Sequence, residues 1–203
     1  MTIHLYEGDL PEEVRFGEVV AVDTETMGLR PQRDRLCLVQ LSGGDGCAHL
    51  VRIPPRGSPA PNLRRLLADP NRLKLFHFAR FDLAVLEHHL GVRCAPVYCT
   101  KIASKLTRTY TDRHGLRDLC RELLGIELDK GPQSSDWGAP ELEERQLQYA
   151  ANDVLHLHAL KERLDALLAR EGRTELAQAC FAFLPTRARL DLLGFDEPDL
   201  FAH

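Results

Sequence analysis

The sequence predicts an α/β protein in which helices cover a mixed β-sheet. Apolar, β-rich segments occupy the first part of the chain, at about 2–6, 18–24, 35–42 and 46–53, and helical patterns dominate from about residue 79 onward. Between these two regions, a buried strand at 73–77 leads directly into a helix, as in folds where helices pack against a sheet. With 203 residues, of which 44% are hydrophobic, the chain suits a single domain spanning 1–203.

Turn signals separate the predicted elements. Gly43–Gly46 lies between two apolar runs and predicts a hairpin, and the proline-rich stretch 54–61 predicts a surface loop. Asn62 is expected to cap a short helix. The apolar stretch 185–203 is expected to be a tail that contacts other subunits. Further helices are expected at about 79–90, 100–109, 116–124, 141–170 with a break, and 174–183.

Composition excludes several classes of protein. A net charge of −4 argues against a protein that coats long nucleic acid through a broad basic surface, although a short nucleic acid has few phosphates to neutralise. The six cysteines form no C-x-x-C motif, so neither a zinc site nor a redox site is indicated. Neither a membrane span nor a signal peptide is recognisable, so we expect no membrane partner and a cytoplasmic location.

Two carboxylates lie at the end of the second predicted strand. Val19–Val22 is a buried apolar run, and Asp23 and Glu25 follow it with one residue between them. Side chains alternate along a strand, so both carboxylates point to the same face and repel each other. An isolated pair of this kind is usually a surface pair balanced by Arg or Lys. Further residues along the chain change that interpretation.

Two predicted helices add an acid each, and one adds a phenol. Asp82 lies near the start of the helix 79–90, where an acid alone is most simply favoured by the helix dipole. Tyr149 and Asp153 are four residues apart, hence neighbours on one helical face with Cβ atoms roughly 5–6 Å apart. Alone, such a pair usually lies on the surface. Each of these acids, however, lies in an apolar segment that disfavours a lone charge.

Taken together, the acids predict a metal site. Convergent carboxylates in a cleft are tolerated when divalent cations neutralise them. Ligands that are all oxygen atoms favour hard ions such as Mg²⁺ or Mn²⁺. Two such ions, roughly 3.5–4 Å apart, hold the attacking and leaving oxygens of phosphoryl transfer. The pattern therefore predicts two divalent cations and phosphoryl-transfer chemistry.

The ordered motifs resemble those of a known enzyme family. "AVDTETMGL", "HFARFDLAVL" and "YAANDV" follow one another as D-x-E, a helical Asp and Y-x-x-x-D. This order is similar to that of the DEDDy 3′–5′ exonucleases and, within them, ribonuclease D. "DRLCLVQLS", "CTKIASKLTRTYTDRHGLRDLC" and "SSDW" narrow the resemblance to the nanoRNase C group, compact ribonuclease D relatives that degrade very short RNAs.

The resemblance implies a fold, a reaction and an assembly. The fold would be RNase H-like, of the ribonuclease D type. The activity would be metal-dependent 3′–5′ exoribonucleolysis of short oligoribonucleotides, especially dinucleotides, to 5′-mononucleotides. The partner would be short RNA, and the chain would form a homo-oligomer, a ring-like octamer. By position, Tyr149 would orient the attacking water, and the metal ligands would be Asp23, Glu25, Asp82 and Asp153.

Candidate substrate contacts are less specific. Leu29 is either a core residue or, as in oligoribonucleases with the same D-x-E-x-x-x-L spacing, a wedge between two bases. Three basic residues recur at helical spacing and form either a solvated helix face or a set of phosphate contacts. They are Lys101, Lys105 and Arg108. The remaining candidates, each with an ordinary core or hydrogen-bonding alternative, are Thr24, His77 and Trp137.

Two other functions stay open at this point. A metal site of this kind attacks a phosphodiester without needing a 2′-hydroxyl, so DNA is an alternative or additional substrate. A non-catalytic nucleic-acid-binding module would have lost one or more of the acids. All four acids and the tyrosine are present, so that reading ranks last.

Overall fold

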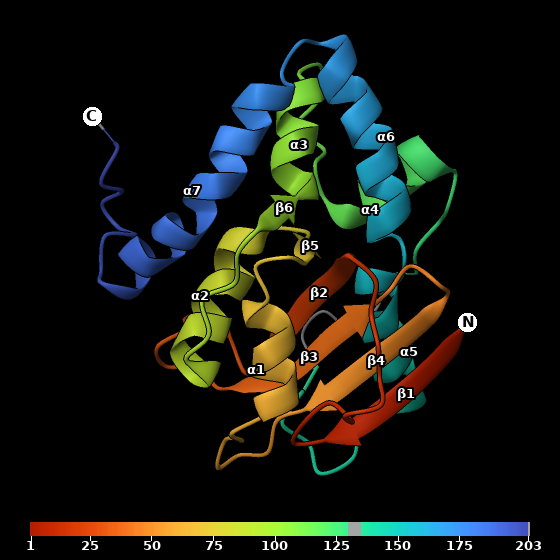
Figure 1. Cartoon of the computed structure of the whole chain (residues 1–203), viewed down its shortest axis with the longest axis vertical. Helices are drawn as coiled ribbons and strands as arrows, with labels where there is room; N and C mark the ends of the chain where they lie inside the picture. Colours follow the sequence, from red (N-terminus) through yellow and green to blue (C-terminus); the bar gives the residue numbers. More distant parts are fainter. Residues whose placement is uncertain (130–134, 203) are drawn as a thin grey trace.

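The computed structural model describes residues 1–129 and 135–202, and a mixed sheet lies at its centre (Figure 1). Its strand order is β1-β4-β3-β2-β5-β6. β2 and β4 pair antiparallel with β3, whereas β1–β4, β2–β5 and β5–β6 pair parallel. The strands are β1 Thr2–Glu7, β2 Val19–Thr26, β3 Leu36–Ser42, β4 Cys47–Arg52, β5 Leu73–Phe76 and β6 Val97–Cys99. Every residue of β3 is buried, which explains its nearly continuous apolar sequence.

Helices cover the sheet and extend it at one end. In Figure 1, α1 and α2 lie in front of the sheet, α5 lies behind it, and α3, α6 and α7 gather beyond β5 and β6. The helices are α1 Pro61–Ala68, α2 Ala79–Leu90, α3 Thr100–Thr107, α4 Leu116–Leu119, the π-helical turn η1 Cys120–Leu124, α5 Glu144–Leu155, α6 Leu157–Arg170 and α7 Thr174–Leu192. The predicted fold class, a mixed sheet flanked by helices, is confirmed. None of the helices within the described residues is long and apolar enough to cross a membrane.

The structure corrects the predicted start of the first helix. Asn62 is not the cap, because α1 already begins at Pro61. The carboxylate of Asp9 instead accepts hydrogen bonds from the backbone N–H groups of Asn62 and Leu63, at 3.0 and 2.9 Å. The free N–H groups at the start of α1 are therefore satisfied by a residue that is distant in sequence. No local sequence pattern indicates such a contact.

The last helix is longer than predicted. α7 continues through Pro185 to Leu192, so the first part of the stretch 185–203 is helical. Leu184, Pro185 and Ala188 are buried, and packing of this face compensates for the hydrogen bond that Pro185 cannot donate. His203, at the end of this stretch, lies outside the described residues.

The topology indicates where a functional site should lie. β2, β5 and β6 are parallel, so their carboxyl ends meet at one edge of the sheet. In open α/β sheets, ligands bind outside this edge. Three segments of the chain arrive there: Asp23–Glu25 near the end of β2, His77 after β5, and Lys101 after β6.

Candidate active site

Three acids from two elements form a cluster at this edge. Asp23 and Glu25 of β2 and Asp153 of α5 each offer a carboxylate oxygen, and these oxygens all lie within 4.8 Å of one another. α5 is held against the sheet by a buried face that includes Ala150 and Val154, and this packing brings Asp153 to the end of β2. The alternation of side chains along β2 places Asp23 and Glu25 on one face, and the packing of α5 brings Asp153 to them. The predicted convergence of these three acids is therefore seen in the structure.

The fourth acid lies beside this cluster rather than within it. Asp82, in the first turn of α2, is buried, and Thr24 Oγ1 donates a hydrogen bond of 2.7 Å to its Oδ1. Thr24 lies between Asp23 and Glu25 in sequence, so this bond ties Asp82 to the same strand. The structure thereby gives Thr24 a partner within the protein, a contact that sequence reasoning missed.

The electrostatics of the acids favour a bound cation. Burial, followed by the charges of neighbouring carboxylates, raises the pKa of Glu25, Asp82 and Asp153, and burial alone raises the pKa of Asp23. Without a counter-charge, ionisation of all four would be costly. The donors of the three-acid cluster are hard oxygen atoms, so the cluster fits Mg²⁺ or Mn²⁺. It could hold a divalent cation through Asp23, Glu25 and Asp153.

A buried amide holds one of the carboxylates. Gln40 lies directly opposite Asp23 in the β2–β3 pairing and is fully buried. Its Nε2 donates a hydrogen bond of 3.0 Å to Asp23 Oδ2. The contact restrains the orientation of the Asp23 carboxylate within the cluster.

Tyr149 lies one helical turn before Asp153, as the spacing predicts. Its ring packs near the buried ring of Trp137, with centroids 6.2 Å apart. Burial, followed by the charge of Asp153, raises the pKa of Tyr149 above its ordinary value. The phenol is therefore protonated at neutral pH and can donate a hydrogen bond. Ser134, the first residue of the "SSDW" motif that contains Trp137, lies outside the described residues.

The cluster opens into a cavity of about 1050 Å³. Leu29 lines this cavity and is 84% exposed, so it is not a core residue. The loop that carries it is braced by Asp34, whose carboxylate accepts a 3.0 Å hydrogen bond from the backbone N–H of Arg30. Gly28 lies so close to Asp34 that a Cβ there would overlap the carboxylate. The loop thus presents an apolar side chain to the cavity.

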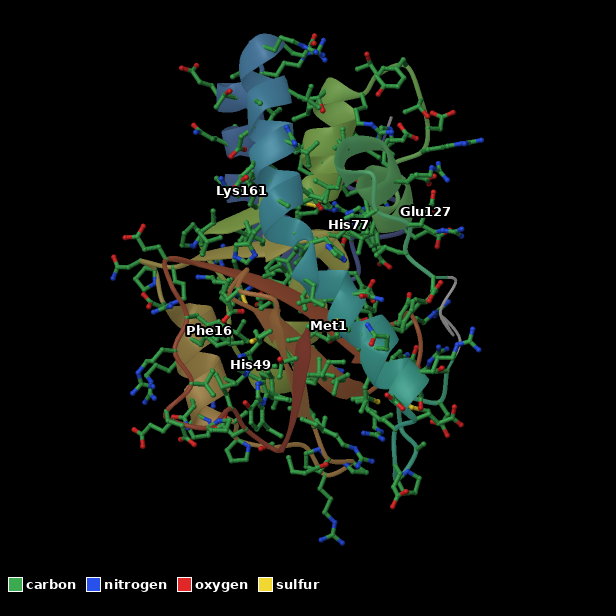
Figure 2. All side chains as sticks on the ribbon, turned by 90° about the vertical axis from the view of Figure 1, so that its right-hand side faces the viewer. Met1, Phe16, His49, His77, Glu127 and Lys161 are labelled. Carbon is green, nitrogen blue, oxygen red and sulfur yellow. The ribbon has the colours of Figure 1, made fainter. Side chains whose placement is uncertain are left out.

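His77 and Lys101 also line the cavity. Figure 2 shows His77 in the interior, where the sheet meets the upper helices. Its Nδ1 lies 2.8 Å from Thr100 Oγ1, and burial lowers its pKa to about 3, so the ring is neutral at physiological pH. A neutral imidazole can contact substrate by hydrogen bonding but brings no positive charge.

The other two basic candidates are not brought to the cavity. Arg108 is buried, with 1% of its surface exposed, and its guanidinium donates to Glu122 and, at 2.7 Å, to the carbonyl of Arg113. The predicted substrate contact of Arg108 is therefore corrected: its charge is used within the fold. Lys105 is exposed but does not line the cavity. Helical spacing alone did not reveal which face of α3 meets the site.

The cavity also contains residues that sequence reasoning missed. Two lie within the "HFARFD" segment itself, so that motif held a usable signal; they are Phe78 and Phe81. Asn152 lies next to Asp153 in sequence. Arg117 comes from α4 and is remote in sequence from the acids, so only the fold indicates its place.

Comparisons with known proteins agree with this geometry. Residues 7–169 match the 3′–5′ exonuclease family, and the chain belongs to that family. Within it, the chain is an NrnC-like member of the DEDD group, which confirms the resemblance to nanoRNase C. Structures of Brucella melitensis NrnC, with bound Mg²⁺ and bound to pGG, are each 56% identical in sequence to this chain, with TM-scores of 0.94 and 0.96. They cover 100% of this chain, which covers 100% and 99% of theirs.

More distant relatives share the catalytic region. Escherichia coli RNase D has a TM-score of 0.74 and 28% identity, over 84% of this chain and 45% of its own. Ribonuclease D of Gluconacetobacter diazotrophicus is 36% identical over 173 residues, which are 85% of this chain and 44% of that protein. The chain thus spans less than half the length of this curated relative. Its fold is that of ribonuclease D-type 3′–5′ exonucleases.

Proposed function

We propose that the chain is a metal-dependent 3′–5′ exoribonuclease that degrades short oligoribonucleotides, especially dinucleotides, to 5′-mononucleotides. The cluster of Asp23, Glu25 and Asp153 carries the proposal, because it lies in a cavity beside a protonated phenol and an exposed leucine. The bound Mg²⁺ and the pGG dinucleotide in Brucella melitensis NrnC support the same substrate size and the same class of ion.

In the proposed reaction, the acids, the tyrosine and the cavity-lining side chains have separate tasks. When bound, two divalent cations supply the positive charge that phosphodiester hydrolysis needs at the attacking and leaving oxygens. Asp23, Glu25 and Asp153 would hold them, with Asp82 completing the site beside Thr24. The oxygen of water bonds to phosphorus as the bond from phosphorus to O3′ breaks. The terminal residue leaves as a 5′-mononucleotide, and the shortened chain gains a proton at its 3′-hydroxyl.

Tyr149 would orient the attacking water. Because the pKa of its phenol is raised, the hydroxyl stays protonated and acts by hydrogen bonding rather than as a base. Substrate contacts would come from Leu29, His77 and Lys101, which line the cavity. Trp137 is buried against Tyr149, so its contribution would be to hold the phenol in place.

Digestion of short substrates tests the proposal and its alternative. We expect 5′-labelled RNAs of two to seven nucleotides, with Mg²⁺ or Mn²⁺, to lose 3′-terminal nucleotides, and dinucleotides to be cleaved fastest. Matched DNAs test the alternative that DNA is a substrate, since the proposed chemistry needs no 2′-hydroxyl. Products that carry a 3′-phosphate, or cleavage that persists in EDTA, would contradict the proposed reaction.

Leu29→Ala is expected to weaken dinucleotide binding by roughly 10- to 100-fold. A leucine inserted between two bases buries apolar surface worth roughly 1.5–3 kcal/mol if fully desolvated, and about 1.4 kcal/mol corresponds to tenfold in affinity. Binding can be measured calorimetrically in Ca²⁺ to slow hydrolysis. A mononucleotide should be affected much less, and the melting temperature should not change because Leu29 is 84% exposed.

The matched control is Leu5→Ala, an exposed leucine in β1 that does not line the cavity. It should bind like the wild type. If Leu29→Ala loses equal affinity for the dinucleotide and the mononucleotide, or loses none, then Leu29 does not act as a wedge between the bases.

We further propose that the chain assembles as a homo-oligomer, an octamer as the resemblance implies, through its C-terminal tail. Residues 193–202 follow α7 and expose four large apolar side chains within ten residues, and exposed apolar groups that gather in one place often mark protein–protein contacts. These side chains are Leu193, Phe195, Leu200 and Phe201.

Deleting residues 193–203 should lower the mass of the particle in light scattering. The deletion keeps Asp191, whose carboxylate accepts hydrogen bonds of 2.6 and 2.9 Å from Arg80 of α2, so the helix pairing survives. Leu5→Ser serves as the control for loss of an exposed leucine elsewhere. The tail also contacts its own helix, through the rings of Phe201 and Phe183 and through hydrogen bonds that Arg187 donates to Phe195 O and Asp199. A truncated chain of unchanged particle mass would show that this internal contact is its role.

A further inference from the structure

Phe78 has a backbone conformation that its side chain disfavours. It precedes α2 with φ 70° and ψ 42°, in the left-handed region where glycine fits without strain. Among the described residues, Ala60 and Phe78 are the non-glycine residues with positive φ. Ala60 is small and fully buried, whereas Phe78 is bulky and 47% exposed. Packing in the core therefore does not explain why a phenylalanine is held in this conformation.

The position of Phe78 offers an explanation. It lies between β5 and α2, one residue after His77, and lines the cavity that contains the acid cluster and Leu29. Strained residues cluster at functional sites, where the surrounding structure holds them in place. An exposed aromatic ring in such a cavity presents a flat apolar face, and every nucleobase has a face that stacks on one.

A cation restrains the ring. Lys101 Nζ, from the first turn of α3, lies 4.2 Å from the centroid of the Phe78 ring. A cation in this place is attracted to the face of the ring and limits its rotation. Lys101 occupies one face, so a base would meet the opposite face. The ammonium group also lines the cavity, where a phosphate could approach it.

We propose that Phe78 is a base-stacking residue that sets a preference for purines in the substrate. The proposal rests on the proposed function, because it needs a nucleotide in the cavity. Leu29 would separate the two bases, and Phe78 would stack on the outer face of one of them. A purine covers more of the ring than a pyrimidine, so it gains more from the contact. The left-handed backbone at Phe78 aims the ring into the cavity.

Binding of two dinucleotides to substituted proteins tests the proposal. The probes are pGG and pCC, with affinity measured calorimetrically in Ca²⁺ on the full chain. Phe78→Ala and Phe78→Gly should each weaken pGG binding on the order of 10- to 100-fold, as expected for loss of one base–aromatic stack. The ratio of pGG to pCC affinity should fall toward one in both. Phe78→Trp should stay within a few-fold of the wild type, and Tyr110→Ala, an exposed aromatic outside the cavity, should not change binding.

The glycine and alanine variants separate the ring from the backbone. Glycine accepts the left-handed conformation and alanine does not, so Phe78→Gly should melt at a higher temperature than Phe78→Ala. If the position matters only for the backbone before Asp82, Phe78→Gly will keep full pGG affinity and an unchanged pGG to pCC ratio. That result overturns the proposal. If the wild-type protein neither binds nor hydrolyses pGG, the proposed function is overturned as well. If the wild type hydrolyses pGG and Phe78→Ala binds pGG as tightly as the wild type does, only the stacking role is overturned.

Discussion

Asp23→Asn is expected to nearly abolish hydrolysis while leaving the chain folded. Asp23 shares the acid cluster with Glu25 and Asp153, and Gln40 donates a hydrogen bond to its carboxylate. Loss of an outer partner of a metal ligand typically costs roughly 10- to 100-fold in metal affinity or activity, so loss of a ligand itself should cost more. Turnover of a labelled dinucleotide at saturating Mg²⁺ measures the effect. We expect the same result for Glu25→Gln, Asp82→Asn and Asp153→Asn.

Although Asp23→Asn should lose activity, we expect it to be more stable than the wild type when no metal is bound. Burial raises the pKa of Asp23, so between its ordinary pKa and the raised one the unfolded chain binds fewer protons than the folded chain. The folded state is therefore penalised at neutral pH, and Asn removes that penalty. Asp23→Asn should melt at a higher temperature than the wild type in EDTA, and added Mg²⁺ should stabilise it less.

Asp112→Asn, at an exposed position outside the cavity, is the matched control and should behave like the wild type in both measurements. Wild-type turnover in Asp23→Asn at saturating Mg²⁺ would contradict the assignment of Asp23 as a metal ligand. A metal-free melting temperature that falls would instead show that Asp23 is needed for the fold.

Local pattern was sufficient for the fold class and for most elements. The helix predicted at 79–90 coincides with α2, because a continuous apolar pattern ends at Gly91, which adopts the left-handed conformation of a helix end. β6 has only three residues, too few for any periodicity, and was not predicted. α7 was predicted to end before Pro185, but packing against its neighbours overrides the proline signal. The assignment of 1–203 to one domain stays a prediction.

The acids of the site were predictable because their spacing carries geometric information. Alternation places Asp23 and Glu25 on one face, and the resemblance to DEDDy exonucleases adds Asp82 and Asp153. Contacts across elements were not predictable: the Gln40 bond to Asp23 depends on strand register, and that register is set by the whole sheet.

Burial of the basic residues was equally inaccessible to sequence reasoning. Arg108 lies seven residues after Lys101, a spacing that predicts the same helical face. Arg108 nevertheless pairs with Glu122 inside the fold, whereas Lys101 lines the cavity. The exposure of Leu29 also follows from its loop, which Asp34 braces, and not from its neighbours in sequence.

Tyr149→Phe is expected to lower turnover by about 10²-fold or more, the size of effect seen when one preorganised hydrogen-bond donor is removed from an active site, and to leave metal binding intact. The substitution removes only the hydroxyl, so the ring still packs near Trp137 and α5 keeps its place. The phenol is protonated, because burial and Asp153 raise its pKa, so its expected role is to hold water by a hydrogen bond. Steady-state kinetics at saturating Mg²⁺ measure the loss, which should fall on kcat rather than on KM.

Metal binding distinguishes this role from that of a ligand. The rise in melting temperature on adding Mg²⁺ should be the same in Tyr149→Phe as in the wild type, whereas Asp153→Asn should reduce it. Tyr110→Phe, at a tyrosine that is 77% exposed, is the control for loss of a phenol elsewhere. If Tyr149→Phe loses affinity for Mg²⁺ and recovers its rate at high Mg²⁺, then the phenol supports the cation site. If the rate stays low at every Mg²⁺ concentration, the hydroxyl acts on the water, as its place one turn before Asp153 indicates.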